Sequence, residues 1–156
     1  MRRSLAVLAA ALGSAALVLG ATVAQGASSR PRPLPGLPAY TAGYRSWSKI
    51  NRVPIPPRRT GDAHRGTKDV YASKRVRGAR YPAGTVIVKE VRRGGVVTIL
   101  AVMRKVRGFS PRNNDWQMIE YSRASSRSRF GVLAQGRICY ACHSGARAND
   151  FVFTKR

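Results

Sequence analysis

Two cysteines and a histidine lie close together near the end of the chain, in the sequence CYACH at residues 139–143. The spacing of Cys139, Cys142 and His143 is that of the attachment motif for c-type haem. Each thiol can add to one vinyl group of the porphyrin, because residues three apart lie on the same side of a helical turn. His143 then supplies a ring nitrogen to the iron as an axial ligand. The motif therefore predicts one covalently attached haem c.

Three other kinds of site use the same residue types. A thioredoxin-like redox site belongs near a βαβ unit, which this sequence does not predict. A structural zinc site needs four ligands, and His64 is the only other histidine. A disulfide between Cys139 and Cys142 suits an oxidising compartment but gives His143 no role. Haem attachment is the interpretation that uses all three residues.

The other axial position of the iron has three candidate ligands in the sequence. Met103 and Met118 lie in predicted strands, where packing in the core explains a methionine. His64 lies in a loop rich in glycine and proline, which favours a surface position. We therefore expect His143 to be the sole protein ligand, which leaves the iron open to small molecules.

The first 26 residues have the layout of a secretory signal peptide. Arg2 and Arg3 precede an apolar segment at residues 5–20, and small residues follow at Ala24 and Gly26. The apolar segment is shorter than the roughly 20 residues of a membrane span. We therefore expect cleavage, a periplasmic or otherwise exported location, and no membrane span in the mature chain. Two further units are predicted after the signal peptide: a linker rich in proline and arginine (27–38) and a haem domain (39–156).

The composition is strongly basic, with 29 Lys+Arg against 6 Asp+Glu and a formal charge of +23. Removing Arg2 and Arg3 with the signal peptide leaves +21. Such a charge accelerates encounters with anionic partners in a salt-dependent way. The basic residues are scattered and do not form a tail or a recognition helix, which favours a solvated surface over nucleic-acid binding. Any redox partner protein is expected to be acidic.

Strands are the main elements expected to position the motif. Residues 84–91 and 96–104 are rich in β-branched residues, and residues 116–123 continue the pattern after a loop. Residues 69–73 form a shorter candidate strand. Because the connections are short, neighbouring strands should be antiparallel.

The expected fold class is α+β, with mainly an antiparallel sheet of about four or five strands, a few packed helices, and haem at the C-terminal motif. One helix is predicted at residues 39–53, because Tyr40, Tyr44, Trp47 and Ile50 recur at helical spacing. A second helix is predicted near residues 133–144.

Four segments together resemble the cytochrome P-460 family, which also contains the beta-type cytochromes c-prime. They are GTVIVKE (84–90), NNDWQMIEYSR (113–123), CYACHSGA (139–146) and NDFVFT (149–154). In addition, HRGTKDVYAS (64–73) is similar to the first core strand of the family and YRSWSKIN (44–51) to its N-terminal helix. The resemblance covers about residues 40–156.

The resemblance implies a largely antiparallel fold that is often dimeric, with His143 as proximal ligand and a pocket for hydroxylamine or nitric oxide. In the oxidising members a lysine is cross-linked to the haem ring, and Lys89 occupies the matching place. Lys68 stands where those members have an arginine, and would be a distal cation. Strand alternation puts Lys89 on one face with Ile87 and Val91, so it points either into the pocket or along the sheet to solvent.

Three functions remain open at this point: oxidation of hydroxylamine, binding of nitric oxide without turnover, and electron transfer. Oxidation of hydroxylamine releases protons, so an enzyme should carry a base near the distal face of the haem. Residues 133–135, just before the haem motif, contain no carboxylate, whereas Glu90 and Glu120 lie in predicted strands.

Overall fold

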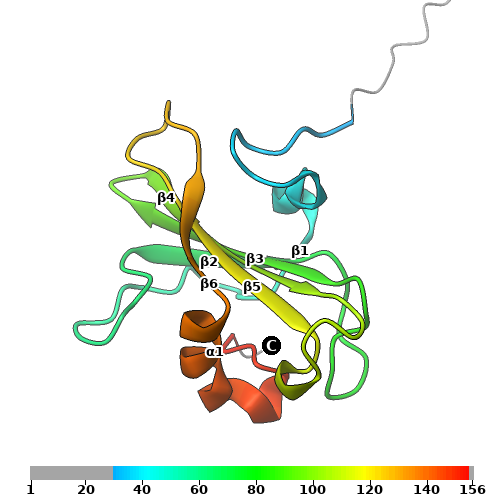
Figure 1. Ribbon diagram of the computed structural model, residues 1–156. Coiled ribbons are helices and arrows are strands. Elements are labelled where there is room, and N and C mark those ends of the chain that lie inside the picture. The colour runs from blue at the N-terminus through cyan, green and yellow to red at the C-terminus, as the bar shows by residue number, and fades with distance from the viewer. Residues whose placement is uncertain (1–29, 155–156) are drawn as a thin grey trace, which may run out of the picture.

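The structure, a computed structural model, describes residues 30–154 and is built on one antiparallel sheet (Figure 1). The strands follow one another across the sheet in chain order. They are β1 (Ser48–Lys49), β2 (Thr67–Ala72), β3 (Val86–Arg93), β4 (Val96–Lys105), β5 (Trp116–Ser122) and β6 (Gly131–Gln135). The predicted signal peptide lies outside the described residues.

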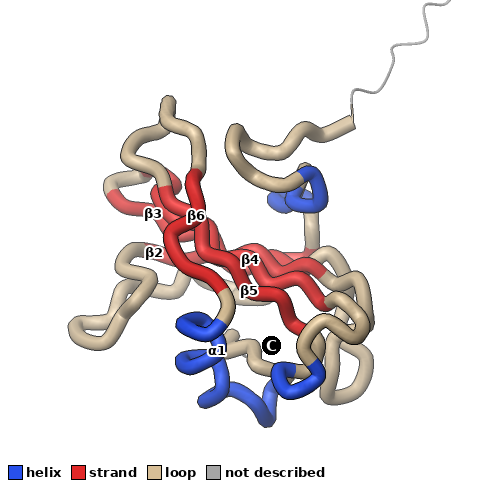
Figure 2. Tube along the Cα trace, viewed as in Figure 1, coloured by secondary structure: helices blue, strands red, loops and turns tan. Residues whose placement is uncertain are grey.

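The helical elements are short, and all but η3 lie toward the two ends of the described chain. They are the 3-10 turns η1 (Ala39–Thr41), η2 (Tyr44–Ser46), η3 (Pro111–Asn113) and η4 (Ser144–Asn149) and the α-helix α1 (Arg137–His143). Figure 2 shows η1 and η2 on one side of the sheet and α1 with η4 on the other. Within residues 30–154, no helix has the length and apolar character needed to cross a membrane.

Each face of the sheet carries its own apolar cluster, because successive side chains of a strand point to opposite faces. The N-terminal-face core contains Leu37, Tyr44, Tyr71, Val86, Val88, Val97, Leu100, Val102, Tyr121 and Phe130. The pocket-face core contains Val70, Ala72, Tyr81, Ile87, Met103, Trp116, Met118, Phe151 and Val152. The C-terminal segment after α1 therefore packs on the face opposite to the N-terminal turns.

The predicted α+β class, with a mainly antiparallel sheet and short helices, is confirmed, and so are the strands at the centre of the sheet. The predicted number of strands is too small, because β1 and β6 form the two edges. β1 has only two residues, and β6 lies partly in the range predicted to be helical. The helix there begins only at Arg137, because Gly136 adopts φ 61° and ψ −125° and turns the chain out of β6.

The predicted helix at residues 39–53 is wrong. Gly43 has φ 67°, which separates η1 from η2, and the chain then extends into β1. The aromatic residues do not share one face of a helix, because Tyr40 and Trp47 pack on the N-terminal-face core and Ile50 packs on the pocket-face core. The chain passes over the edge of the sheet at this point, and its apolar spacing reflects contacts with both faces.

A charged cluster joins the first three strands. Asp69 in β2 is 4% exposed and lies 2.7 Å from Lys49 Nζ and 2.6 Å from an Arg92 guanidinium nitrogen. The Asn51 amide also donates to it at 3.0 Å. Burial alone would raise the pKa of Asp69, but these three hydrogen bonds outweigh it and lower the pKa to about 2. The carboxylate is therefore more acidic in the folded protein than in the unfolded chain.

This difference predicts a pH-dependent contribution of Asp69 to stability. The contribution is complete above the unfolded pKa of about 3.9 and is lost as the pH falls through about 2. Asp69→Asn should lower the free energy of unfolding by about 2 kcal/mol at pH 6, since one pKa unit corresponds to about 1.4 kcal/mol. Urea unfolding followed by circular dichroism at pH 6, 4 and 2.5 measures this. A difference between variant and wild type that stays constant over this range would contradict the prediction.

Candidate haem-binding site

α1 presents the two cysteines on one side of a short, anchored helix. The Gly136 carbonyl accepts hydrogen bonds from the backbone N–H groups of Cys139 and Tyr140, both at 3.0 Å. The Tyr140 hydroxyl donates to the Trp116 carbonyl at 2.8 Å, which ties α1 to β5. Cys139 and Cys142 are free thiols and are one helical turn apart. The motif is thus held close to the sheet.

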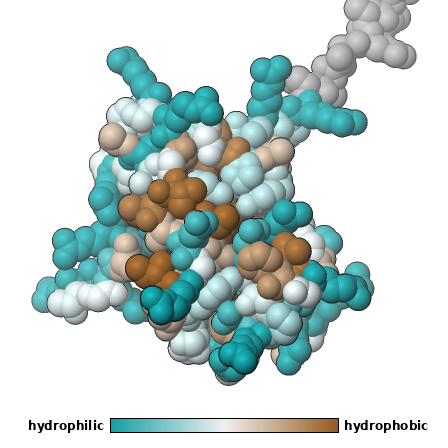
Figure 3. Space-filling model, in the orientation of Figure 1, coloured by the Kyte–Doolittle hydropathy of each residue, from teal (hydrophilic) through white to brown (hydrophobic). Residues whose placement is uncertain are grey.

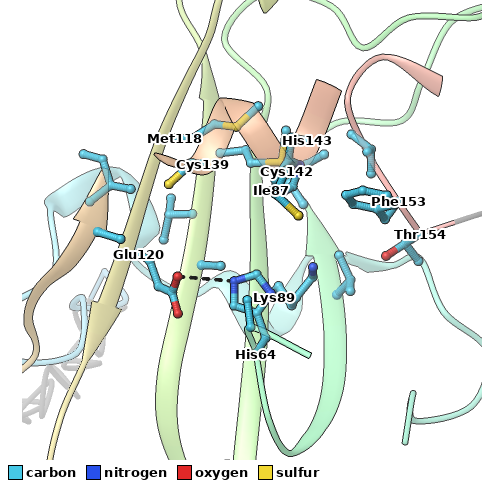
Figure 4. Close-up of a pocket in the computed structure, with 18 of the residues that line it drawn as sticks. His64, Ile87, Lys89, Met118, Glu120, Cys139, Cys142, His143, Phe153 and Thr154 are labelled. Carbon is cyan, nitrogen blue, oxygen red and sulfur yellow. Dashed lines mark ion pairs between the residues drawn. The ribbon is translucent and has the colours of Figure 1, made fainter. Parts of the chain in front are cut away.

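A pocket lies between α1, the pocket face of the sheet and the C-terminal segment, and Figure 4 shows its lining side chains. They include Ile87, Lys89, Ala101, Met103, Met118, Glu120, Ala134, Ile138, Cys139, Cys142, His143, Phe153 and Thr154, with His64 from the loop before β2. About 820 Å³ of space free of protein atoms lies here, including the open mouth. Most of the lining side chains are apolar, and the polar ones are few and lie close together, as in sites that bind cofactors and ligands.

The ring of His143 has a defined orientation. Its Nδ1 lies 2.7 Å from the Phe151 carbonyl oxygen, and the ring packs edge-on against Phe153 with 5.3 Å between centroids. Because a carbonyl can only accept, Nδ1 carries the hydrogen and Nε2 keeps its lone pair. Burial lowers the pKa of His143, although the hydrogen bond to Phe151 opposes this. Both the tautomer and the neutral charge suit a metal ligand.

These residues fit a haem c group. Such a group needs two thiols one turn apart, a neighbouring imidazole with a free Nε2 and mainly apolar surroundings, and this open pocket provides all three. Cys139 and Cys142 would hold the porphyrin, and His143 would be its axial ligand.

One row of cross-strand partners forms the wall of the pocket opposite α1. Val70, Lys89, Ala101, Glu120 and Ala134 are paired in turn from β2 to β6. Ala101 therefore lies between Lys89 and Glu120 on neighbouring strands. Because the alanine side chain is small, it leaves space between the two charged side chains.

Lys89 lies on the face that it shares with Ile87, as strand alternation predicts, and of the two directions left open by the sequence its side chain takes the one into the pocket. Burial lowers the pKa of Lys89, and the charge of Lys68 lowers it further. Charge interactions with Cys142, Asp62 and Glu120 act in the opposite direction. The environment therefore disfavours the charged form more than solvent does, and the neutral amine is the nucleophilic form.

Glu120 and His64 meet in the same pocket. Glu120 Oε2 lies 3.4 Å from His64 Nε2, and the two side chains are 12% and 16% exposed (Figure 4). Glu120 Oε1 is buried and has no hydrogen-bond partner among the described residues. A bulge in the pairing of β5 with β6 follows Glu120, and bulges often reorient side chains at functional sites. The pair supplies a carboxylate whose second oxygen is free to interact with a ligand.

The sequence predicts neither the pairing of these residues nor their shared pocket, although it names His64 as a candidate axial ligand and Glu120 as a strand carboxylate. The surface position expected for His64 is wrong, because the loop before β2 folds over the mouth of the pocket. Glu120 carried a signal that could have placed it: it is two residues after Met118, so alternation puts both on one face.

Comparison with known proteins agrees with this geometry. The sequence model of the cytochrome P460 family matches residues 41–154, which include every strand and α1. The chain belongs to the cytochrome P460 family. This family is one of c-type cytochromes, and membership implies a haem c cofactor. No curated protein sequence matches the chain.

Lys68, expected from the family resemblance to be a distal cation, lies beside the pocket that carries Lys89. Its Nζ is 2.7 Å from Asp62 Oδ2 and also donates to the Gly66 carbonyl at 3.0 Å. Asp62 in turn accepts from the His64 backbone N–H at 3.2 Å. In this member of the cytochrome P460 family, Lys68 therefore holds the loop that presents His64, and its charge acts on Lys89 at longer range.

Met103 and Met118, the other candidate axial ligands, line the pocket as well. Both are buried and pack in the pocket-face core with Trp116 and Ile87. Their setting is that of core residues, which agrees with the packing role that the sequence favoured.

Proposed function

We propose that the mature chain is an exported mono-haem c-type cytochrome that binds small nitrogen-oxide species at an open iron site and oxidises hydroxylamine. The observation that carries this proposal is the composition of one pocket. It brings together the attachment residues of α1, the amine of Lys89 and the Glu120–His64 pair. A binding protein without turnover needs only the first of these.

The haem, when bound, supplies an iron that accepts electrons from hydroxylamine and passes them on. The chain must then remove the protons that this oxidation releases. Glu120 Oε1 is the oxygen free to accept a proton, and Oε2 is 3.4 Å from His64 Nε2. Protons therefore pass from Glu120 to His64, which lies in the loop at the mouth of the pocket.

Lys89 is proposed to form a carbon–nitrogen bond with the edge of the haem ring. This bond replaces one amine N–H and one ring C–H, and the two protons and two electrons that are released pass to a two-electron oxidant of the peroxide class. The neutral amine favoured by burial is the species that such a bond needs. Its side chain starts from the same wall of the pocket as Glu120, two strands away.

Electrons must leave to an acceptor, and the surface suggests which kind of protein accepts them. Removal of the signal peptide leaves a charge of +21, which attracts an acidic redox protein and makes the association sensitive to salt. Exposed apolar side chains lie next to the haem motif, with Val132 and Leu133 in β6 and Ile138 in α1. In Figure 3, hydrophobic residues gather toward the middle of the viewed face and hydrophilic ones surround them.

The role of Glu120 gives the sharpest test of catalysis against binding. Glu120→Gln keeps the shape of the side chain but removes the base, so hydroxylamine oxidation should fall about 100-fold, the lower limit for loss of a general base. Nitric oxide binding and haem content should stay unchanged. The measurement is hydroxylamine-dependent reduction of a small electron acceptor by purified holoprotein.

Glu90→Gln is the matched control, because Glu90 is also a buried strand carboxylate but contacts Tyr44 and Arg45 on the opposite face. It should leave the rate unchanged. If Glu120→Gln oxidises hydroxylamine as fast as wild type, this residue is not the base. If wild type binds nitric oxide but never reduces the acceptor, the chain is a gas-binding protein. A low-spin ferric spectrum would instead indicate a six-coordinate electron carrier.

A further inference from the structure

Asp150 is a buried carboxylate in the segment after α1, outside the pocket that holds the haem motif. Its side chain is 0% exposed, and Lys105 Nζ donates to its two oxygens at 2.8 and 2.7 Å. The Tyr81 backbone N–H donates to Oδ2 at 2.7 Å, and the Asn114 amide donates to Oδ1. The Asp150 main chain is held as well, because Trp116 Nε1 donates to its carbonyl at 2.8 Å. Groups from β4, β5 and two loops thus converge on one residue.

The backbone at this residue has an unusual conformation. Asp150 and Phe151 are consecutive residues with φ of 52° and 64°, and neither is glycine. Residues with a side chain disfavour this region, so such a turn persists where its surroundings hold it. The hydrogen bonds to Asp150 are the contacts that hold it here. Without these hydrogen bonds, the backbone of the turn would relax toward negative φ angles, which residues with a side chain prefer.

The turn has a direct consequence for the haem ligand. It directs the Phe151 carbonyl at His143 Nδ1, and the two atoms are 2.7 Å apart. A ligating histidine that donates its second N–H to a fixed acceptor has a fixed ring orientation and a more basic metal-binding nitrogen. The contacts therefore run without a gap from Lys105 through Asp150 and Phe151 to His143.

We propose that Asp150 is a positioning residue for the haem ligand His143, acting through the carbonyl of Phe151. The inference rests on the proposed function only in taking His143 as the iron ligand. Loss of the Lys105–Asp150 ion pair loosens the turn, lengthens the bond from His143 Nδ1 and makes Nε2 a weaker donor to the iron. A weaker donor stabilises the ferrous state relative to the ferric state.

Asp150→Asn is the first test, because asparagine has the same size and tolerates positive φ, so the charge is the main change. In the ferrous holoprotein, the iron–histidine stretching band measured by resonance Raman spectroscopy should move to lower frequency. In a spectroelectrochemical titration, the ratio of reduced to oxidised haem at a fixed potential should rise about tenfold, which for one electron is about 59 mV.

Glu90→Gln is again the matched control, since Glu90 is also 0% exposed and ion-paired, with Arg45 at 2.8 Å and Arg92 at 2.6 Å. It should lower the unfolding temperature without moving the band or the potential. If both variants move them equally, or if Asp150→Asn moves neither, the positioning role is overturned.

Asn114→Gly provides a milder second variant in case Asp150→Asn does not fold. It removes one neutral donor from Asp150, keeps the Lys105 ion pair and suits the positive φ of Asn114. A shift in the same direction supports the proposal, and an unmoved band overturns it. A wild-type protein without any iron–histidine band would overturn the ligand assignment and this inference together, whereas a band present but unmoved overturns the inference alone.

Discussion

A mature chain with both Cys139→Ala and Cys142→Ala should retain no haem after denaturation and acid–organic extraction, whereas the wild type should retain one haem per chain. The thiols provide the covalent links, and the described residues contain no other cysteine. Each single variant should keep one link and lose haem in part. This is the largest effect expected of any change to the chain, because every proposed activity depends on the haem.

The measurement is the intact mass of denatured protein together with its visible absorbance. Tyr140→Phe is the matched control, because it removes the hydroxyl that anchors α1 to the Trp116 carbonyl and leaves both thiols in place. It should keep its haem. Haem that extracts freely from the wild type would overturn covalent attachment, and the family fold would then hold the group by other contacts.

Lys89→Ala should restore an ordinary haem c spectrum and abolish hydroxylamine oxidation, while nitric oxide still binds. The reason is the proposed bond between the lysine amine and the ring edge, which would perturb the ring and displace its absorption bands. Burial lowers the pKa of Lys89, so the neutral amine needed for this bond is available closer to neutral pH than for a solvated lysine.

Mass spectrometry and absorption spectra of wild type and variant measure this directly. The wild-type mass should equal chain plus haem less the hydrogens lost in the extra bond. Lys74→Ala is the control, because the Lys74 amine donates a hydrogen bond to the Ala83 carbonyl away from the pocket. This substitution should change neither the spectrum nor the activity. An ordinary wild-type spectrum together with no hydroxylamine-dependent reduction of an acceptor would show that Lys89 is not cross-linked, and nitric oxide binding would become the favoured function.

Local features of the sequence were enough to predict the parts of this protein that depend on neighbouring residues. The thiols and the imidazole of CYACH are close because they are on one helical turn, whatever surrounds them. The strands at the centre of the sheet follow from β-branched residues in short runs. The face of Lys89 follows from alternation within β3, since a strand has a period of two.

Features that depend on partners distant in sequence could not be predicted in this way. Tyr40 to Ile50 show helical spacing, yet the chain crosses the sheet edge there and packs on both faces. β6 is an edge strand only because β5 offers it a partner. In each case a contact with a distant element outweighs the local pattern.

The candidate site likewise combines features set by neighbouring residues with features set by contacts between distant elements. Cys139, Cys142 and His143 were predicted from a motif and Lys89 from the family resemblance, whereas the pair of Glu120 with His64 required the sheet register and the fold of a loop. The Asp150 turn likewise depends on donors from β4, β5 and two loops. The sequence alone thus predicted which groups would bind haem, because they are neighbours along the chain. Only the tertiary structure brought Glu120 and His64 together in the pocket and placed Asp150 beside the turn that contacts His143, because those interactions join residues that the chain itself keeps far apart.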